Sequence, residues 1–116
     1  MQKRITNDII REPILQEFKE LPEFFIGRGE VKGCSFRLVQ RSCSAYIYEV
    51  LQPFCDKRYE VFKRKEDARF GKIAYPKASA FGIWAWSART IEKAEKYFHQ
   101  INVKAAEDRK KPNDDL

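Results

Sequence analysis

The sequence predicts an α+β fold, an antiparallel meander of three to four strands packed on a C-terminal helix, with a short N-terminal helix. Two observations lead to it. Three runs rich in aromatic and β-branched residues are separated by very short loops, which is typical of antiparallel hairpins. A later stretch carries one apolar stripe at helical spacing. A chain of 116 residues is the usual size of one domain, and we expect that domain to span residues 1–103.

The first 26 residues are predicted to form an N-terminal helical arm. Pro13 suits the first turn of a helix over 8–26, and Ile14, Phe18 and Leu21 then recur on one side. Pro22 should end that helix, because a proline disfavours the helical conformation in the residue before it. A glycine-containing connection over 27–33 follows.

Three strands are expected near 33–41, 45–52 and 57–64. We predict a register in which Arg41 pairs with Ala45 and Gln52 pairs with Lys57. One face then forms a core for the helix, and its residues are Phe36, Leu38, Tyr46, Tyr48, Val50, Tyr59 and Val61. The opposite face is mixed and includes Arg37, Val39, Arg41, Ile47, Glu49, Leu51, Arg58, Glu60, Phe62 and Arg64.

A long basic connection over 65–80 leads to a fourth strand near 81–86 and a helix over 88–101. Ser87 is the predicted N-cap, with Trp86 and Ile91 forming a hydrophobic staple. The apolar stripe of this helix is Ile91, Ala94, Phe98 and Ile101. The charged, aromatic-free segment 104–116 is predicted to be disordered.

Composition excludes several classes of protein. The apolar runs are too short for a membrane span, and the N-terminal segment lacks the apolar core of a signal peptide, so a cytoplasmic location is expected. Three cysteines without a CxxC pair, and a single histidine, predict neither a disulfide framework nor a metal or cofactor site. The net charge is +6, and residues 57–77 concentrate it, with eight basic side chains against three acidic ones.

An enzyme is the least favoured class. In the predicted register Glu49 and Glu60 lie opposite each other, as the two carboxylates of a glycosidase can. Arg37 and Arg58 nearby explain the pair equally well as a surface ion network. The Gly27-Arg-Gly29 element lacks the Gly-Lys-Ser/Thr ending of a phosphate-binding loop.

A non-enzymatic binding module is the leading functional hypothesis, with DNA or RNA as the favoured partner. Arginines and an aromatic ring presented from strands can contact phosphates and bases. The candidate binding residues lie on the mixed face and the following loop, and they are Arg37, Arg41, Arg58, Phe62, Lys63, Arg64, Lys65, Arg69 and Lys72. Phe62 is the candidate stacking group. If the N-terminal arm instead covers that face, most of this surface disappears.

The alternative is a protein-interaction or inhibitor domain. Aromatic residues are favoured at interface centres, and exposed sheet edges permit strand pairing between copies. The response to salt separates the two hypotheses, since binding to phosphates weakens steeply as salt rises.

Two segments, Arg58-Tyr-Glu-Val-Phe-Lys-Arg64 and Phe81-Gly-Ile-Trp-Ala-Trp86, resemble small uncharacterised proteins of phages and mobile elements of gut bacteria. The similarity covers about residues 26–101 and rests on aromatic core positions. It implies a compact accessory protein and says nothing of mechanism. The order of elements is also similar to that of the arm-binding domains of tyrosine integrases.

Overall fold

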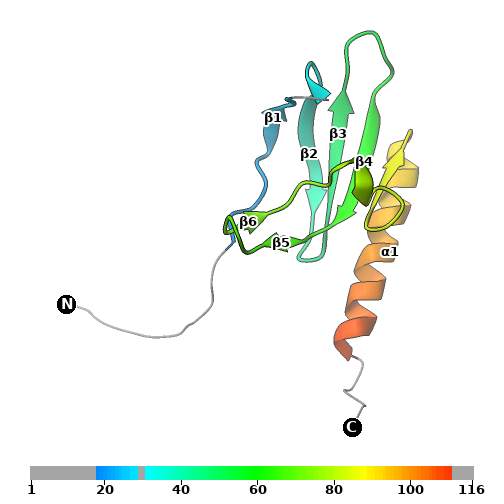
Figure 1. Ribbon diagram of the computed structural model, residues 1–116. Helices are drawn as coiled ribbons and strands as arrows, with labels where there is room; N and C mark the ends of the chain where they lie inside the picture. The colour runs from blue at the N-terminus through cyan, green and yellow to red at the C-terminus, as the bar shows by residue number, and fades with distance from the viewer. Residues whose placement is uncertain (1–17, 29–30, 111–116) are drawn as a thin grey trace, which may run out of the picture.

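The computed structural model describes residues 18–28 and 31–110, and it confirms the α+β class (Figure 1). Five antiparallel strands form one sheet in the order β1-β2-β3-β4-β7. Their bounds are Phe24–Ile26 (β1), Ser35–Arg41 (β2), Ala45–Leu51 (β3), Arg58–Lys63 (β4) and Ala85–Ala88 (β7). The remaining elements are a two-stranded ribbon of β5 (Glu66–Asp67) and β6 (Lys72–Ile73), a 3-10 turn η2 (Ala78–Ala80), and the helix α1 (Ile91–Lys110).

The predicted N-terminal helix is not found over residues 18–26, and its earlier part, 8–17, lies outside the described residues. Residues 24–26 instead form β1, which pairs with β2 so that Phe25 lies opposite Phe36. An apolar run Phe-Phe-Ile beside a sheet edge gains more from strand pairing than from the helix that its spacing permits, because Phe25 can then stack directly on Phe36 with ring centroids 4.6 Å apart.

The predicted strand register is only partly correct. Arg37 lies opposite Glu49 as expected, but a bulge between Leu38 and Gln40 shifts the pairing, so that Arg41 faces Tyr46 rather than Ala45. In the next hairpin Val50 lies opposite Arg58, one residue away from the prediction. The turn explains this slip: Cys55 donates its N–H to the Gln52 carbonyl, and Phe54 adopts a left-handed conformation with φ 63°.

That one-residue slip moves every β4 side chain to the other face. Tyr59 and Val61 now share a face with Ile47, and α1 packs on them through Ala94, Phe98 and Ile101. The apolar stripe of the helix is therefore confirmed, but the helix covers the face that we predicted to be open. We call this the helix face.

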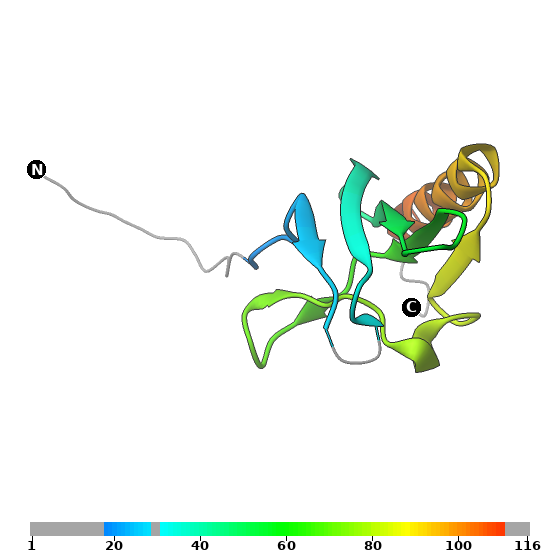
Figure 2. The ribbon, with the colours of Figure 1, turned by 90° about the horizontal axis from the view of Figure 1, so that it is seen from above.

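The opposite face carries Tyr46, Tyr48 and Phe62, and we call it the tyrosine face. The connection after β4, which we predicted to be long and basic, folds back over it. Ile73 and Ala80 from that connection are 1% and 4% exposed. Figure 2 shows the sheet between α1 on one side and this connection on the other. Both faces of β3 and β4 are consequently buried.

The ends of α1 also differ from the prediction. Ser87 belongs to β7, and the N-cap is Thr90, whose hydroxyl accepts a hydrogen bond from the Lys93 N–H at 3.2 Å. The helix continues to Lys110, so the prediction of disorder is wrong for 104–110, while 111–116 lie outside the described residues. Apolar contacts of α1 end near Ile101, and the charged residues after it extend the helix by propensity.

Buried tyrosines predict a loss of stability in alkali. Desolvation raises the pKa of Tyr46 to about 12 and raises the pKa of Tyr48 and Tyr75 above the usual 10. Stability from these groups is fully present below about pH 10 and falls as pH rises further, because the unfolded chain releases their protons first. Each should contribute a slope of up to about 1.4 kcal/mol per pH unit. Urea unfolding at pH 8, 10 and 11 measures it, and a Tyr75→Phe variant should show the shallower slope.

Candidate nucleic-acid interface

Phe62, the predicted stacking group, is fully buried and cannot meet a base. Its exposed fraction is 0%, and its ring lies 5.4 Å from Tyr46, 5.9 Å from Tyr48 and 4.8 Å from Tyr75, measured between centroids. The prediction is wrong because the β3–β4 register places Phe62 on the tyrosine face, beneath the folded-back connection.

Replacing Phe62 should therefore change stability. We expect Phe62→Ala to lower the free energy of unfolding by about 3–5 kcal/mol, since it leaves a cavity among packed rings. Chemical denaturation measures this. The matched control is Phe70→Ala, which removes a ring that is 66% exposed and should cost less than about 0.5 kcal/mol. Equal small effects in both variants would contradict the core assignment.

Two of the predicted arginines are engaged inside the protein. The Arg58 guanidinium donates to the Glu60 carboxylate at 3.1 Å and to the Gln52 side chain at 3.2 Å. Arg64 donates from Nη2 to Glu20 Oε2 at 2.7 Å and from Nη1 to Glu66 at 3.0 Å. The two glutamates neutralise Arg64, so its charge contributes little to any surface that attracts phosphate.

Two more predicted residues lie on the side of the sheet opposite the connection, so they cannot share a surface with the predicted residues of that connection. Arg37 and Lys63 are exposed, but the register places both on the helix face. The connection and its ribbon lie on the opposite side of the sheet (Figure 2). The candidate residues on the strands therefore do not share the single sheet face that we predicted, because the one-residue slip of β4 and the covering connection separate them.

The same register separates the two carboxylates that suggested catalysis. Glu60 pairs with Tyr48 and lies on the tyrosine face, whereas Glu49 pairs with Tyr59 and points to the helix face. Lys57 binds Glu49 at 3.3 Å on that side. The expected opposition of the two glutamates is thus wrong, and they cannot flank one bond.

Three of the four remaining predicted residues belong to the ribbon β5–β6 or directly precede it, and they are Lys65, Arg69 and Lys72. Asp67 shapes the turn of this ribbon: it accepts hydrogen bonds from the Arg69 backbone N–H at 3.1 Å and from the Arg69 guanidinium at 3.2 Å. The bound guanidinium lowers the pKa of Asp67. Gly71 completes the turn with φ 63°, a conformation that favours glycine.

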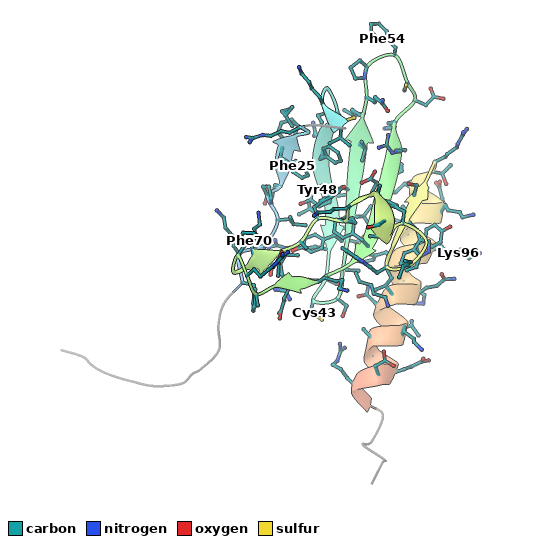
Figure 3. The ribbon with its side chains drawn as sticks, in the orientation of Figure 1. Phe25, Cys43, Tyr48, Phe54, Phe70 and Lys96 are labelled. Carbon is teal, nitrogen blue, oxygen red and sulfur yellow. The ribbon has the colours of Figure 1, made fainter. Side chains whose placement is uncertain are left out.

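Phe70 projects from the end of this ribbon, away from the sheet (Figure 3). Its ring is 66% exposed, and two cations lie beside it: the Arg69 guanidinium carbon 5.2 Å from the ring centroid and Lys72 Nζ 5.6 Å from it. Sequence reasoning missed Phe70. An aromatic residue between Arg69 and Gly71, in a turn that needs no apolar side chain, was the available signal.

Segment 18–23 attaches the ribbon to the rest of the molecule. The Lys19 N–H donates to the Gly71 carbonyl at 2.9 Å, and the Ile73 N–H donates to the Lys19 carbonyl at 2.9 Å. Lys19 is thereby placed next to Lys72 as a further exposed cation. Lys65 lies on the other side, with Nζ 5.1 Å from the Trp84 ring centroid. We name Lys19, Lys65, Arg69, Phe70 and Lys72 the ribbon surface.

Arg41 lies close to Glu20, a residue that helps to hold segment 18–23 in place. It lines a shallow pocket with Glu20 and Arg64. The Arg64 hydrogen bonds are the largest cause that lowers the pKa of Glu20, burial opposes them, and the charge of Arg41 makes a smaller contribution. The Tyr46 hydroxyl also donates to the Glu20 carboxylate. The Glu20 carboxylate therefore helps to hold segment 18–23 to the tyrosine face, together with the hydrogen bond that the Tyr48 hydroxyl donates to the Pro22 carbonyl.

No cluster of histidine, cysteine, aspartate or glutamate suited to a metal ion occurs among residues 18–28 and 31–110. In the same part of the chain, no helix is both long and apolar enough to cross a membrane. No protein-family model, curated protein or solved structure matches this chain.

Neutralising Glu20 should loosen segment 18–23. Glu20→Gln weakens the hydrogen bonds from Arg64 and should lower the free energy of unfolding at pH 7 by about 1 kcal/mol. The folded-state pKa of Glu20 is below 4.5, so its contribution is present above that pH and is lost as pH falls through the folded value. The difference in stability between the two proteins should shrink as pH falls through that folded value. Glu66→Gln, at the more exposed partner of Arg64, is the control and should change little.

Proposed function

We propose that this protein is a non-enzymatic binding module for single-stranded nucleic acid, and that the ribbon surface is its contact site. The observation that carries the proposal is Phe70, an exposed aromatic ring flanked by cations at the end of a projecting ribbon. Proteins that bind single strands combine aromatic side chains, on which bases stack, with cations that follow the phosphates.

The charges of the ribbon surface suit this role. Asp67 neutralises Arg69, but the described residues provide no ion pair for Lys19, Lys65 or Lys72. The three lysines can each meet one phosphate, while Phe70 stacks on a base. Three phosphate contacts on a single strand correspond to a salt slope of about −2, or roughly a twenty-fold loss of affinity between about 50 and 200 mM salt.

Fluorescence anisotropy with a labelled oligonucleotide of about ten nucleotides tests the proposal. We expect Phe70→Ala to weaken binding by roughly tenfold, because one base loses its stacking partner. Lys72→Ala should make the salt slope shallower by about 0.7. Phe54→Ala is the matched aromatic control: Phe54 is fully exposed at the far end of the β3–β4 hairpin (Figure 3).

Equal losses from Phe70→Ala and Phe54→Ala would contradict the ribbon surface, as would a salt slope near zero. A single-stranded RNA and a DNA of the same sequence, run in parallel, decide which nucleic acid is preferred. A duplex of that sequence tests the stacking role, since its bases are not available to Phe70.

A second candidate is a protein-interaction or inhibitor domain of a phage or mobile element. It is favoured by the uncovered part of the helix face, where α1 lies over β3, β4 and β7 but β1 stays open. Phe24 and Ile26 on β1 are 53% and 56% exposed there, and β1 is also an edge strand. Exposed apolar side chains at a sheet edge are a common way to bind a protein strand. Such an interface would tolerate salt.

A further inference from the structure

A cavity of about 820 Å³ opens on the tyrosine face, apart from the ribbon surface. It lies between the end of β1 and the segment 75–81, and its floor is formed by β4 and β7. Small-molecule sites commonly have volumes of about 300–1,000 Å³, an apolar lining and a few convergent polar groups. The proposed function makes no use of this cavity.

One wall of the cavity is aromatic. Phe25 stacks on Phe36 with an interplanar angle of 3°, and Tyr75 meets the edges of both rings at 5.5 and 5.4 Å between centroids. Phe81 and Pro76 line the cavity from the connection. Rings held by one another in this way present a pre-formed apolar surface, on which a flat ring can pack with little loss of side-chain entropy.

The floor of the cavity is polar, and some of its polar groups already have hydrogen-bond partners within the protein. Glu60 is 7% exposed, and its two carboxylate oxygens accept hydrogen bonds from the Tyr75 hydroxyl at 2.7 Å and from Arg58 at 3.1 Å. Arg58 uses one further N–H for Gln52, so that a guanidinium with five donors keeps capacity for another acceptor. The Ser87 hydroxyl lines the cavity on the same side.

The charges around the cavity favour an anion. Its described lining carries the cations Arg28, Arg58 and Lys77 against the single carboxylate of Glu60, which Arg58 and Tyr75 already bind. A concave site with an excess of positive charge raises the local concentration of anions. A second cation would be repelled, and a neutral ring would leave the remaining donors of Arg58 unused.

We infer that this cavity binds a small aromatic carboxylate. The ring of the ligand packs against Phe25, Tyr75 and Phe81, and its carboxylate accepts hydrogen bonds from Arg58 and Ser87, with Lys77 adding charge at the rim. Arginine suits this role because its planar donors match a carboxylate. The inference is independent of nucleic-acid binding, since the two sites share no residue.

The test is a titration of the full chain with 2-naphthoate, followed by two-dimensional amide NMR. The expected result is a saturating shift of the amides of Phe25, Tyr75, Lys77 to Phe81, and Ser87, with the amides of the ribbon surface unchanged. Neutral 2-naphthamide should bind at least tenfold more weakly. An aliphatic carboxylate of similar size should also bind more weakly, because it cannot stack.

Two variants test whether the NMR shifts depend on the charges of Arg58 and Lys77. Arg58→Gln should abolish saturable binding, but it also leaves Glu60 buried without its cation and can destabilise the fold. Lys77→Glu reverses an exposed rim charge and should weaken 2-naphthoate at least fivefold without unfolding the protein. Lys96→Glu, on the exposed side of α1, is the matched control and should bind as the unchanged chain does (Figure 3).

Three results would overturn the inference. The first is the absence of cavity shifts at millimolar 2-naphthoate, and the second is equal affinity for the amide. The third is a Lys77→Glu variant with unchanged affinity. Oligonucleotide binding measured on the same samples keeps the two proposals apart, because Lys77→Glu lies outside the ribbon surface and Phe70→Ala lies outside the cavity.

Discussion

The stack of rings on the tyrosine face is the interaction on which the rest of the structure depends. Tyr46, Tyr48 and Phe62 lie side by side on β3 and β4, and Tyr75 meets Tyr48 and Phe62 edge-on from above. The Tyr75 hydroxyl also binds the buried Glu60. Because Tyr75 belongs to the connection after β4, its burial draws that whole segment across the sheet. The sheet is therefore covered on both faces, whereas the predicted meander had one covered face.

The hydroxyl groups of the stacked tyrosines hold the other covering segment. Tyr48 donates to the Pro22 carbonyl, and Tyr46 donates to Glu20, which Arg64 also binds. A buried hydroxyl without a partner is costly, so these bonds satisfy the rings and position residues 18–23 together. Lys19 then joins the ribbon β5–β6 by backbone hydrogen bonds. The position of Phe70 thus follows from a chain of contacts that starts in the core.

Because both faces of the central strands are covered, we expect binding sites at the margins of the sheet. Side chains on both faces of β3 and β4 are buried in the core, and Arg58 and Arg64 form ion pairs with glutamates. The ribbon, the β3–β4 loop around Phe54 and the open side of β1 are among the parts that stay exposed. The cavity beneath segment 75–81 is a further consequence, since a connection that folds back over a sheet leaves space where it turns.

The sequence by itself determined the fold class, three of the strands and the apolar stripe of α1, because those depend on periodicity within one segment. It did not determine which face the helix covers. That depended on one left-handed residue at Phe54 and one bulge after Leu38, each of which moves side chains across the sheet without changing the local pattern. Nor did it place Phe62 in the core and Phe70 outside it. Both are aromatic residues among cations, and only long-range contacts with Tyr46, Tyr48 and Tyr75 distinguish them.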